Sequence, residues 1–170
     1  MNPIYIDATD EAPNVKLDAI NGIFEISGRS VITNVIAFYN PILNWLDEYL
    51  KSPNEKTCFK FKMDYFNTAS SKCILDIILK IEVISKISDV TIRWHYQSND
   101  DDMMEAGKEY ADIVDVNIVL VENDGHEHDE HENEMSSQSS ESGQDNPENT
   151  SKTSGKTNRF KRILDKFVAK

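Results

Sequence analysis

The sequence predicts an α/β sandwich, in which helices pack on a mixed β-sheet, followed by a disordered C-terminal tail. Three observations predict this architecture. A hairpin signal near the start of the chain indicates two antiparallel strands. After residue 30, segments with helical hydrophobic spacing alternate with segments of strand-like spacing, which indicates parallel pairs joined by helices. Over residues 122–158, Met135 is the only large apolar residue of the kind that a core requires.

The first predicted element is a hairpin over residues 15–27. Val15, Leu17 and Ala19 alternate with polar neighbours, and residues 23–26 form the returning strand. The Asn-Gly pair at positions 21 and 22 is the dipeptide that a two-residue type I′ turn prefers. We therefore expect two antiparallel strands joined by a tight turn.

Three helices are predicted after the hairpin. The first covers residues 33–50 and should break or kink at Pro41, because proline removes a backbone donor from a helix. The second begins with Asn67 or Thr68 as its N-cap and reaches about residue 88; its isoleucines would also suit a strand, but its length favours a helix. The third follows the acidic run 100–102, whose charge suits a helix N-terminus. The apolar faces are Ile36, Tyr39, Leu43, Leu46 and Leu50 in the first helix, and Ile74, Ile77, Ile78, Ile81 and Ile84 in the second.

Three strands alternate with these helices, over residues 57–65, 90–96 and 116–121. In the first of them apolar and charged side chains alternate, which is typical of a strand with one buried face. In the second, Trp94 should lie on the face opposite His95. The apolar face expected for residues 57–65 consists of Phe59, Phe61, Met63 and Tyr65.

Composition narrows the class of protein. The chain has 170 residues, and its 30 acidic side chains outnumber 18 basic ones, for a net charge of −12. Binding to nucleic acid is not expected, because phosphate contacts need clustered Lys and Arg. The two cysteines, Cys58 and Cys73, form no CxxC pair and are expected to be buried thiols of a reducing compartment. Since neither a signal peptide nor a membrane span is visible, we expect a cytoplasmic protein.

The chain divides into three parts of different charge. Residues 1–121 form the predicted domain, with a net charge of −8. Residues 122–158 contain 10 acidic side chains and 2 Lys, and are predicted to be a disordered acidic linker. Residues 159–170 carry a charge of +4 and the spacing of a basic amphipathic helix. That helix could contact a partner or a membrane surface, fold back on the acidic domain, or have little function.

No sequence motif predicts a catalytic, metal or cofactor site. Gly-rich phosphate loops, a GxSxG elbow and an HExxH motif are all missing from the sequence. His126, His128 and His131 lie among carboxylates, but in the predicted linker, where no fold would hold metal geometry. His95 as a general base, with the acidic run 100–102 as a magnesium site, is the alternative enzyme hypothesis. We therefore expect no cofactor, no metal and no enzymatic activity.

One segment combines the features of a regulatory switch. It runs from Tyr65 to Lys72, and its residues 67–71 place three hydroxyl groups around a helix start. A phosphate group there would add nearly two negative charges, which backbone N–H groups at a helix N-terminus tolerate. From these residues alone, Ser and Thr are also ordinary helix caps.

A resemblance supports the switch interpretation. The sequence carries, in order and at matching spacing, short segments that together resemble the SiaC family over about residues 9–121. These segments are Ile26-Ser27-Gly28-Arg29-Ser30, Phe38-Tyr39-Asn40-Pro41, Trp45-Leu46-Asp47-Glu48-Tyr49, Tyr65-Phe66-Asn67-Thr68-Ala69-Ser70-Ser71-Lys72, Ile74-Leu75-Asp76-Ile77 and Trp94-His95-Tyr96.

The resemblance implies a STAS-like fold, similar to that of the anti-anti-sigma factor SpoIIAA, and a function in cyclic di-GMP and biofilm signalling. In that family, a SiaB-like kinase phosphorylates the protein and a SiaA-like PP2C-type phosphatase reverses this. The unphosphorylated form binds and activates a diguanylate cyclase. Thr68 matches the modified threonine of the family motif Asn-Thr-Ser-Ser-x-Lys. The expected partner interface near the switch consists of Asn67, Ala69, Ser70, Ser71 and Lys72.

Two departures from the family pattern bear on the partner. Ala69 replaces the first serine after the threonine, which leaves the phosphoacceptor in place. Residues 32–34 are Ile-Thr-Asn, where family members often have Pro-Glu-Asn, so the effector can differ from a cyclase. The remaining alternative is a scaffold or membrane-associated protein that acts through residues 159–170.

Overall fold

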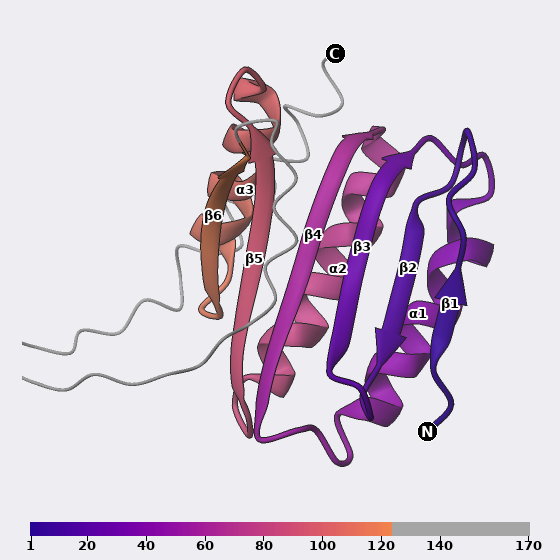
Figure 1. Ribbon diagram of the computed structural model, residues 1–170, viewed down its shortest axis with the longest axis vertical. Coiled ribbons are helices and arrows are strands. Elements are labelled where there is room, and N and C mark those ends of the chain that lie inside the picture. The colour runs from indigo at the N-terminus through magenta and orange to yellow at the C-terminus, as the bar shows by residue number, and fades with distance from the viewer. Residues whose placement is uncertain (124–170) are drawn as a thin grey trace, which may run out of the picture.

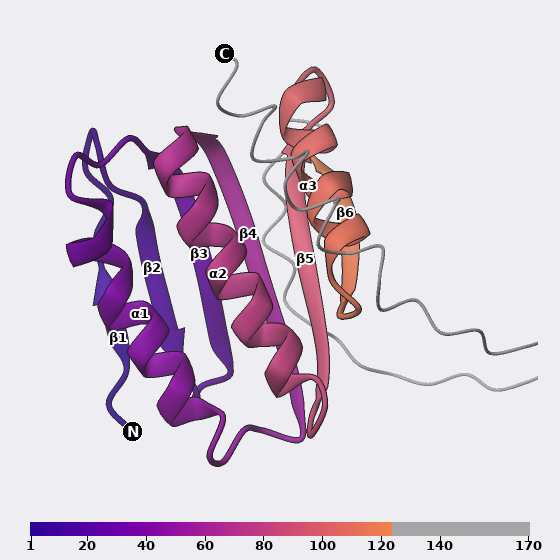
Figure 2. The ribbon, with the colours of Figure 1, turned by 180° about the vertical axis from the view of Figure 1, so that it is seen from behind.

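The computed structural model describes residues 1–123, which form one six-stranded sheet with three helices on one of its faces (Figures 1 and 2). The spatial order of the strands is their order in the chain. The first three strands pair antiparallel, and the third to the sixth pair parallel. This confirms the predicted mixed α/β sandwich. The strands are β1 (Ile4–Ile6), β2 (Asn14–Asp18), β3 (Ile23–Ser30), β4 (Lys56–Phe66), β5 (Asp89–Gln97) and β6 (Asn117–Asn123), and the helices are α1 (Val35–Tyr49), α2 (Thr68–Ile84) and α3 (Asp101–Ile113).

The β2–β3 hairpin is confirmed, but its turn differs from the predicted one. Asp18 pairs with Ile23, so four residues form the loop instead of two. The Asp18 carboxylate accepts hydrogen bonds from the backbone N–H groups of Ile20 and Asn21, at 3.0 and 3.1 Å. A side chain that accepts hydrogen bonds from the backbone two and three residues further on stabilises a longer loop. The prediction of a two-residue type I′ turn was therefore wrong. β1, which the sequence did not predict, is a three-residue strand paired with β2.

Helix α1 begins at Val35, where the Asn34 side chain caps it, and continues through Pro41 without a break. Pro41 is exposed, so the donor that it lacks lies on the solvent side of the helix. The predicted apolar face was partly wrong: Tyr39 and Leu46 are buried, whereas Ile36 is 61% exposed. The side chains that α1 buries are Val35, Tyr39, Ile42, Trp45, Leu46 and Tyr49. This stripe is rotated from the predicted one because the aromatic rings of Trp45 and Tyr49 pack on Phe24 of β3.

The predicted stripe of α2 is confirmed, since all five isoleucines are buried. The helix ends at Ile84, four residues earlier than expected. It lies beside α1 on the same face of the sheet, which Figure 2 shows from the helix side. The helical interpretation of this isoleucine-rich segment was therefore right, because tertiary packing outweighs intrinsic strand preference.

Strand β4 contains a bulge that corrects one predicted face. Gly28 of β3 pairs with Met63, but Arg29 pairs with Tyr65, so Asp64 is the extra residue. Gly28 has φ of +95°, a conformation that glycine adopts without strain. As a result, Tyr65 leaves the face of Phe61 and Met63 and lies 49% exposed, with the Arg29 guanidinium 5.3 Å from its ring centre.

Helix α3 packs closely on β5 and β6. A Cβ atom at Gly107 would lie 2.4 Å from Cδ1 of Trp94 and 2.6 Å from Cδ2 of Leu120, so only glycine fits. Trp94 is fully buried and its indole N–H donates to the Met103 carbonyl at 2.9 Å. Strand β6 reaches Asn123, two residues beyond the predicted end of the domain.

Several predictions concern other parts of the chain or its thiols. The acidic linker, the basic helix at 159–170 and the three histidines of the linker lie outside the described residues. Cys73 is buried as predicted, whereas Cys58 is only half-buried. Within residues 1–123, the helices are too short or too polar to cross a membrane.

Candidate functional site

The predicted switch lies at the start of α2, where the chain leaves the end of β4 (Figure 1). Asn67 is the N-cap: its side-chain oxygen accepts from the Ser70 N–H at 2.9 Å, and its own N–H donates to the Ser30 carbonyl at 3.1 Å. An N-cap of this kind satisfies a donor that the helix cannot satisfy itself. The sequence offered Asn67 or Thr68 as the cap, and the structure assigns that role to Asn67, so Thr68 is the first helical residue.

The three hydroxyl groups of this segment differ in accessibility. Thr68 is half-buried, whereas Ser70 and Ser71 are 0% and 5% exposed. Ser70 and Ser71 continue the apolar stripe of α2 toward its N-terminus, while Thr68 and Lys72 lie one turn apart on another side. Of the five predicted interface residues, Ala69 and Lys72 are exposed and Asn67 is half-buried, while the two serines lie in the core. Helical spacing could have revealed this division from sequence.

Ser70 belongs to a buried chain of hydroxyl groups. Ser30 Oγ donates to Ser70 Oγ at 2.8 Å, and Ser30 Oγ lies 2.8 Å from the Tyr39 hydroxyl. Because the single Ser30 proton is directed to Ser70, the Tyr39 hydroxyl is the donor to Ser30. Burial raises the pKa of Tyr39 to about 12, partly offset by its bond to Ser30, so this donor keeps its proton at neutral pH.

Ser71 makes a second buried contact, with α3. Its Oγ lies 3.0 Å from the Tyr110 hydroxyl, which also donates to the Ser71 carbonyl at 3.3 Å. Burial raises the pKa of Tyr110 above its ordinary value. Hydrogen bonds therefore connect the first turn of α2 directly to β3 and to α3. They connect it indirectly, through Ser30 of β3, to α1. Sequence reasoning missed Ser30, Tyr39 and Tyr110 as supports of the site, because these contacts join residues 9 to 40 positions apart.

His95 lies elsewhere, on the open face of the sheet, which is the face turned away from the helices. Its Nδ1 is 3.2 Å from the Asn123 side-chain oxygen, and burial lowers its pKa. It lines a hollow of about 130 Å³ together with Lys62, Asp64 and Asp100. The side chain of Asp100 accepts from the Met103 N–H at 2.9 Å and caps α3, which gives the first residue of the acidic run a structural role.

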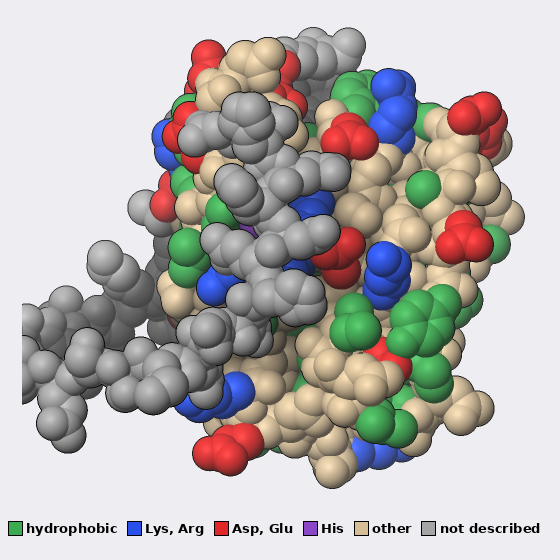
Figure 3. Space-filling model, viewed as in Figure 1, with side chains coloured by type: hydrophobic (Ala, Val, Ile, Leu, Met, Phe, Trp, Pro, Cys, Tyr) green, Lys and Arg blue, Asp and Glu red, His purple; other side chains and the backbone are tan. Residues whose placement is uncertain are grey.

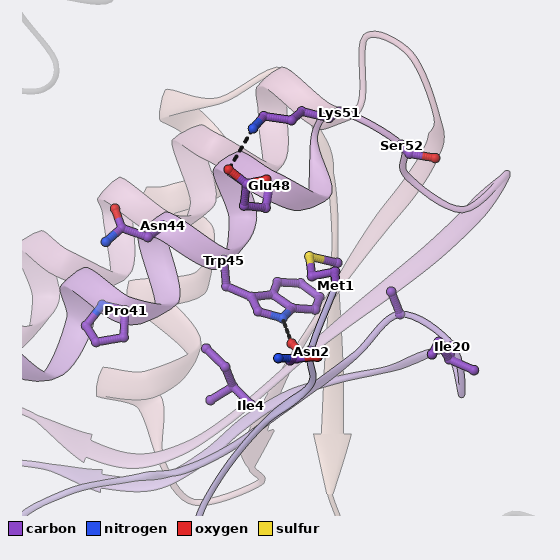
Figure 4. A pocket seen from close by; sticks show the side chains of 11 residues that line it. Met1, Asn2, Ile4, Ile20, Pro41, Asn44, Trp45, Glu48, Lys51 and Ser52 are labelled. Carbon is purple, nitrogen blue, oxygen red and sulfur yellow. Dashed lines mark hydrogen bonds and ion pairs between the residues drawn. The ribbon is translucent and has the colours of Figure 1, made fainter.

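A larger hollow, of about 670 Å³, lies between the N-terminal segment and α1, at the other end of the sheet from Thr68 (Figures 1 and 4). Trp45 points into it, and its indole N–H donates to the Asn2 carbonyl at 2.8 Å. The two charged side chains that line it, Glu48 and Lys51, form an ion pair with each other at 2.7 Å. The charges of Glu48 and Lys51 in this hollow therefore neutralise each other.

Fold and site together define a mixed α/β domain in which a half-buried threonine begins a helix, and buried hydroxyl groups hold the first turn of that helix. The chain belongs to the SiaC family, because the family model described as "SiaC family regulatory phosphoprotein" matches residues 6–123. This confirms the resemblance stated for the sequence.

Sequence and structure comparisons with individual proteins are consistent with this family assignment. An uncharacterized protein of Pseudomonas aeruginosa strain UCBPP-PA14 is 23% identical over 113 residues, which cover 66% of this chain and 90% of the relative. The solved structure of SiaC of Pseudomonas aeruginosa matches with a TM-score of 0.66 and 21% identity, covering 72% of this chain and 100% of SiaC. A structure of the diguanylate cyclase SiaD in complex with its activator SiaC, from the same organism, matches with a TM-score of 0.64 and 21% identity over 71% of this chain and 99% of the matched chain. At this identity the structures establish a shared fold.

Proposed function

We propose that this chain is a phosphorylation-switched adaptor without enzymatic activity of its own, and that Thr68 is its phosphoacceptor. In its unphosphorylated form it binds and activates a diguanylate cyclase. A SiaB-like kinase transfers the γ-phosphoryl group of ATP to the Thr68 oxygen, and a SiaA-like PP2C-type phosphatase hydrolyses the phosphate ester. Because the kinase reaction uses ATP, we place this cycle in the cytoplasm.

The observation that carries the proposal is the difference between the three hydroxyl groups at the start of α2. A kinase must reach the acceptor oxygen, and Ser70 and Ser71 are buried and bonded to Ser30 and Tyr110. Thr68 is half-buried at the surface of the first turn. The membership in a family of regulatory phosphoproteins makes a modification site expected. Thr68 is less buried than Ser70 and Ser71, the two serines of the matching motif.

The position of Thr68 explains how the fold would tolerate the modification. A phosphate at the first helical residue faces the positive end of the helix dipole, where added negative charge is stabilising. Lys72, exposed and one turn further along α2, lies within reach of a phosphate group as an i,i+4 neighbour. The Asn67 cap and the buried serines use other atoms, so they keep their bonds. The change is therefore one of surface charge, which suits a switch between partners.

The structure of SiaD with its activator SiaC supports a diguanylate cyclase as the effector. A negatively charged phosphate at Thr68 would repel or sterically exclude a surface that fits the neutral side chain. Ala69 and Thr33 are both exposed, and both are positions where this chain departs from the family pattern. These positions would adapt the interface to its own effector, because a surface residue changes specificity with little effect on stability.

The test is to incubate the full chain with its genomically neighbouring kinase and ATP, and to locate phosphate by mass spectrometry. We expect phosphate on Thr68 alone and no incorporation into Thr68→Ala. Ser70→Ala is the matched control, because it removes a buried hydroxyl of the same turn and should still be modified. Phosphate that persists in Thr68→Ala would contradict the assignment.

A further inference from the structure

Figure 3 views the molecule from the open face of the sheet, where the central strands β4 and β5 carry three basic side chains. Lys60 of β4 and Arg93 of β5 are register partners, and Lys62 follows two residues after Lys60 on the same face. Residues 1–123 contain 20 acidic and 11 basic side chains, so this group runs against the charge of the domain. We call Lys60, Lys62 and Arg93 the basic face.

Charge on the basic face is only partly neutralised by its neighbours. Lys62 forms an ion pair with Glu25 of β3 at 3.0 Å. Within residues 1–123, neither Lys60 nor Arg93 has an ion-pair partner. Burial lowers the pKa of His95 and its hydrogen bond to Asn123 raises it, while the nearby charges of the basic face lower it further. The face is therefore suited to an anionic occupant.

The chain itself supplies such an occupant immediately after β6. Residues 124–134 contain six carboxylates and no Lys or Arg. They begin at the end of β6, beside β5. An extended chain spans up to about 3.3–3.6 Å per residue, so these residues can reach roughly 36 Å. Strands are about 4.8 Å apart, which puts β4 only about 10 Å across the sheet from β6. The segment can therefore cover the basic face without strain.

We propose that the acidic segment 124–134 docks on the basic face, over Lys60, Lys62 and Arg93. Tethering through β6 gives the segment an effective concentration on the order of millimolar at this face, so individually weak ion pairs are sufficient. This inference is independent of Thr68, which lies at the start of a helix on the other side of the sheet.

The test uses the full chain labelled with a nitroxide just after the segment, at Ser136→Cys in a Cys58→Ser background. Cys73 is buried, and the Cys58→Ser parent without the added thiol checks that it takes up no label. We expect loss of NMR amide signal at Lys60, Lys62 and Arg93, and little loss in α1 and α2. The loss should disappear at about 1 M salt, where the Debye length falls to about 3 Å.

Charge variants then separate specific docking from general proximity. Lys60→Gln with Arg93→Gln should abolish the signal loss on the open face. Lys51→Gln with Lys108→Gln removes the same charge from the exposed helix side and should leave the loss unchanged. Equal signal loss on both faces of the sheet, or loss that persists after the Lys60 and Arg93 substitutions, would overturn the proposal.

Discussion

Ser30 Oγ and Ser70 Oγ are hydrogen-bonded at 2.8 Å in the core, both with 0% exposure. This bond joins the end of β3 to the first turn of α2, two residues after the proposed phosphoacceptor. The hydroxyl group of Tyr39 in α1 in turn donates a hydrogen bond to Ser30 Oγ. The start of α2 is therefore held by atoms that a phosphate on Thr68 would not touch. Phosphorylation at the surface should leave these buried hydrogen bonds intact.

Removing the Ser30 hydroxyl should destabilise the domain. Ser30→Ala leaves the Tyr39 and Ser70 hydroxyl groups buried without their common partner, and an unsatisfied buried polar group costs about 1–3 kcal/mol. Urea unfolding should show this loss in the free energy of unfolding. Ser27→Ala, in the same strand but on the open face, is the control and should change the free energy by less than about 0.5 kcal/mol. Equal effects of the two substitutions would show that the buried chain of hydroxyl groups contributes nothing.

The raised pKa of Tyr39 predicts a loss of stability at alkaline pH. An unfolded tyrosine ionises near pH 10, while burial raises the pKa of folded Tyr39 to about 12. The stability is thus intact below pH 10 and falls as the pH rises toward 12, by about 2–3 kcal/mol for two pKa units. Tyr39→Phe removes this contribution, so its free energy of unfolding should decline less over that window. Parallel declines in denaturant titrations of the two proteins would contradict the assigned pKa.

The Asn67 cap should contribute measurably to the stability of α2. Replacing an N-cap Asn by Ala costs about 0.5–2 kcal/mol, and we expect Asn67→Ala to fall in this range. Asn34→Ala removes the equivalent cap of α1, whose bond to Ala37 is longer, 3.2 Å against 2.9 Å, and more exposed. We therefore expect the smaller effect from Asn34→Ala in thermal unfolding. The reverse order would mean that the start of α2 is held mainly by its buried serines.

Adding a single methyl group at Gly107 should destabilise the domain. In an exposed helix, Gly→Ala would stabilise by roughly 1 kcal/mol. Here the new Cβ would lie 2.4 Å from the buried Trp94 side chain, and such overpacking costs about 1–3 kcal/mol. We expect Gly107→Ala to be destabilised, with altered Trp94 fluorescence. Ala111→Gly, at an exposed position of the same helix, calibrates the intrinsic helix preference. A more stable Gly107→Ala variant would disprove the close contact.

Local patterns in the sequence were sufficient for most of the fold. The isoleucine stripe of α2 and the alternation in β4 placed these elements correctly because burial follows their periodicity. Tyr65 was misplaced because a bulge depends on the partner strand, and the face of α1 was misplaced because several stripes fit its sequence. The three-residue strand β1 is too short to show a pattern.

The candidate site was predictable in part. Asn67 and Thr68 could be identified from helix-start chemistry and from the resemblance to the SiaC family. The roles of Ser30 and Tyr110 could not, because they arise from contacts between distant residues. The division between accessible Thr68 and buried Ser70 was available from helical spacing, since Ser70 lies one turn before Ile74 on the buried side.

The most direct measurement compares the unphosphorylated and Thr68-phosphorylated chains in calorimetric titration against the diguanylate cyclase, with thermal unfolding of both. The proposal predicts that phosphorylation weakens binding roughly tenfold or more, equal to about 1.4 kcal/mol, while the unfolding temperature stays nearly unchanged. Equal affinity of the two forms would contradict the proposed switch. Loss of binding together with loss of the folded structure would contradict the role given to the buried support beneath Thr68.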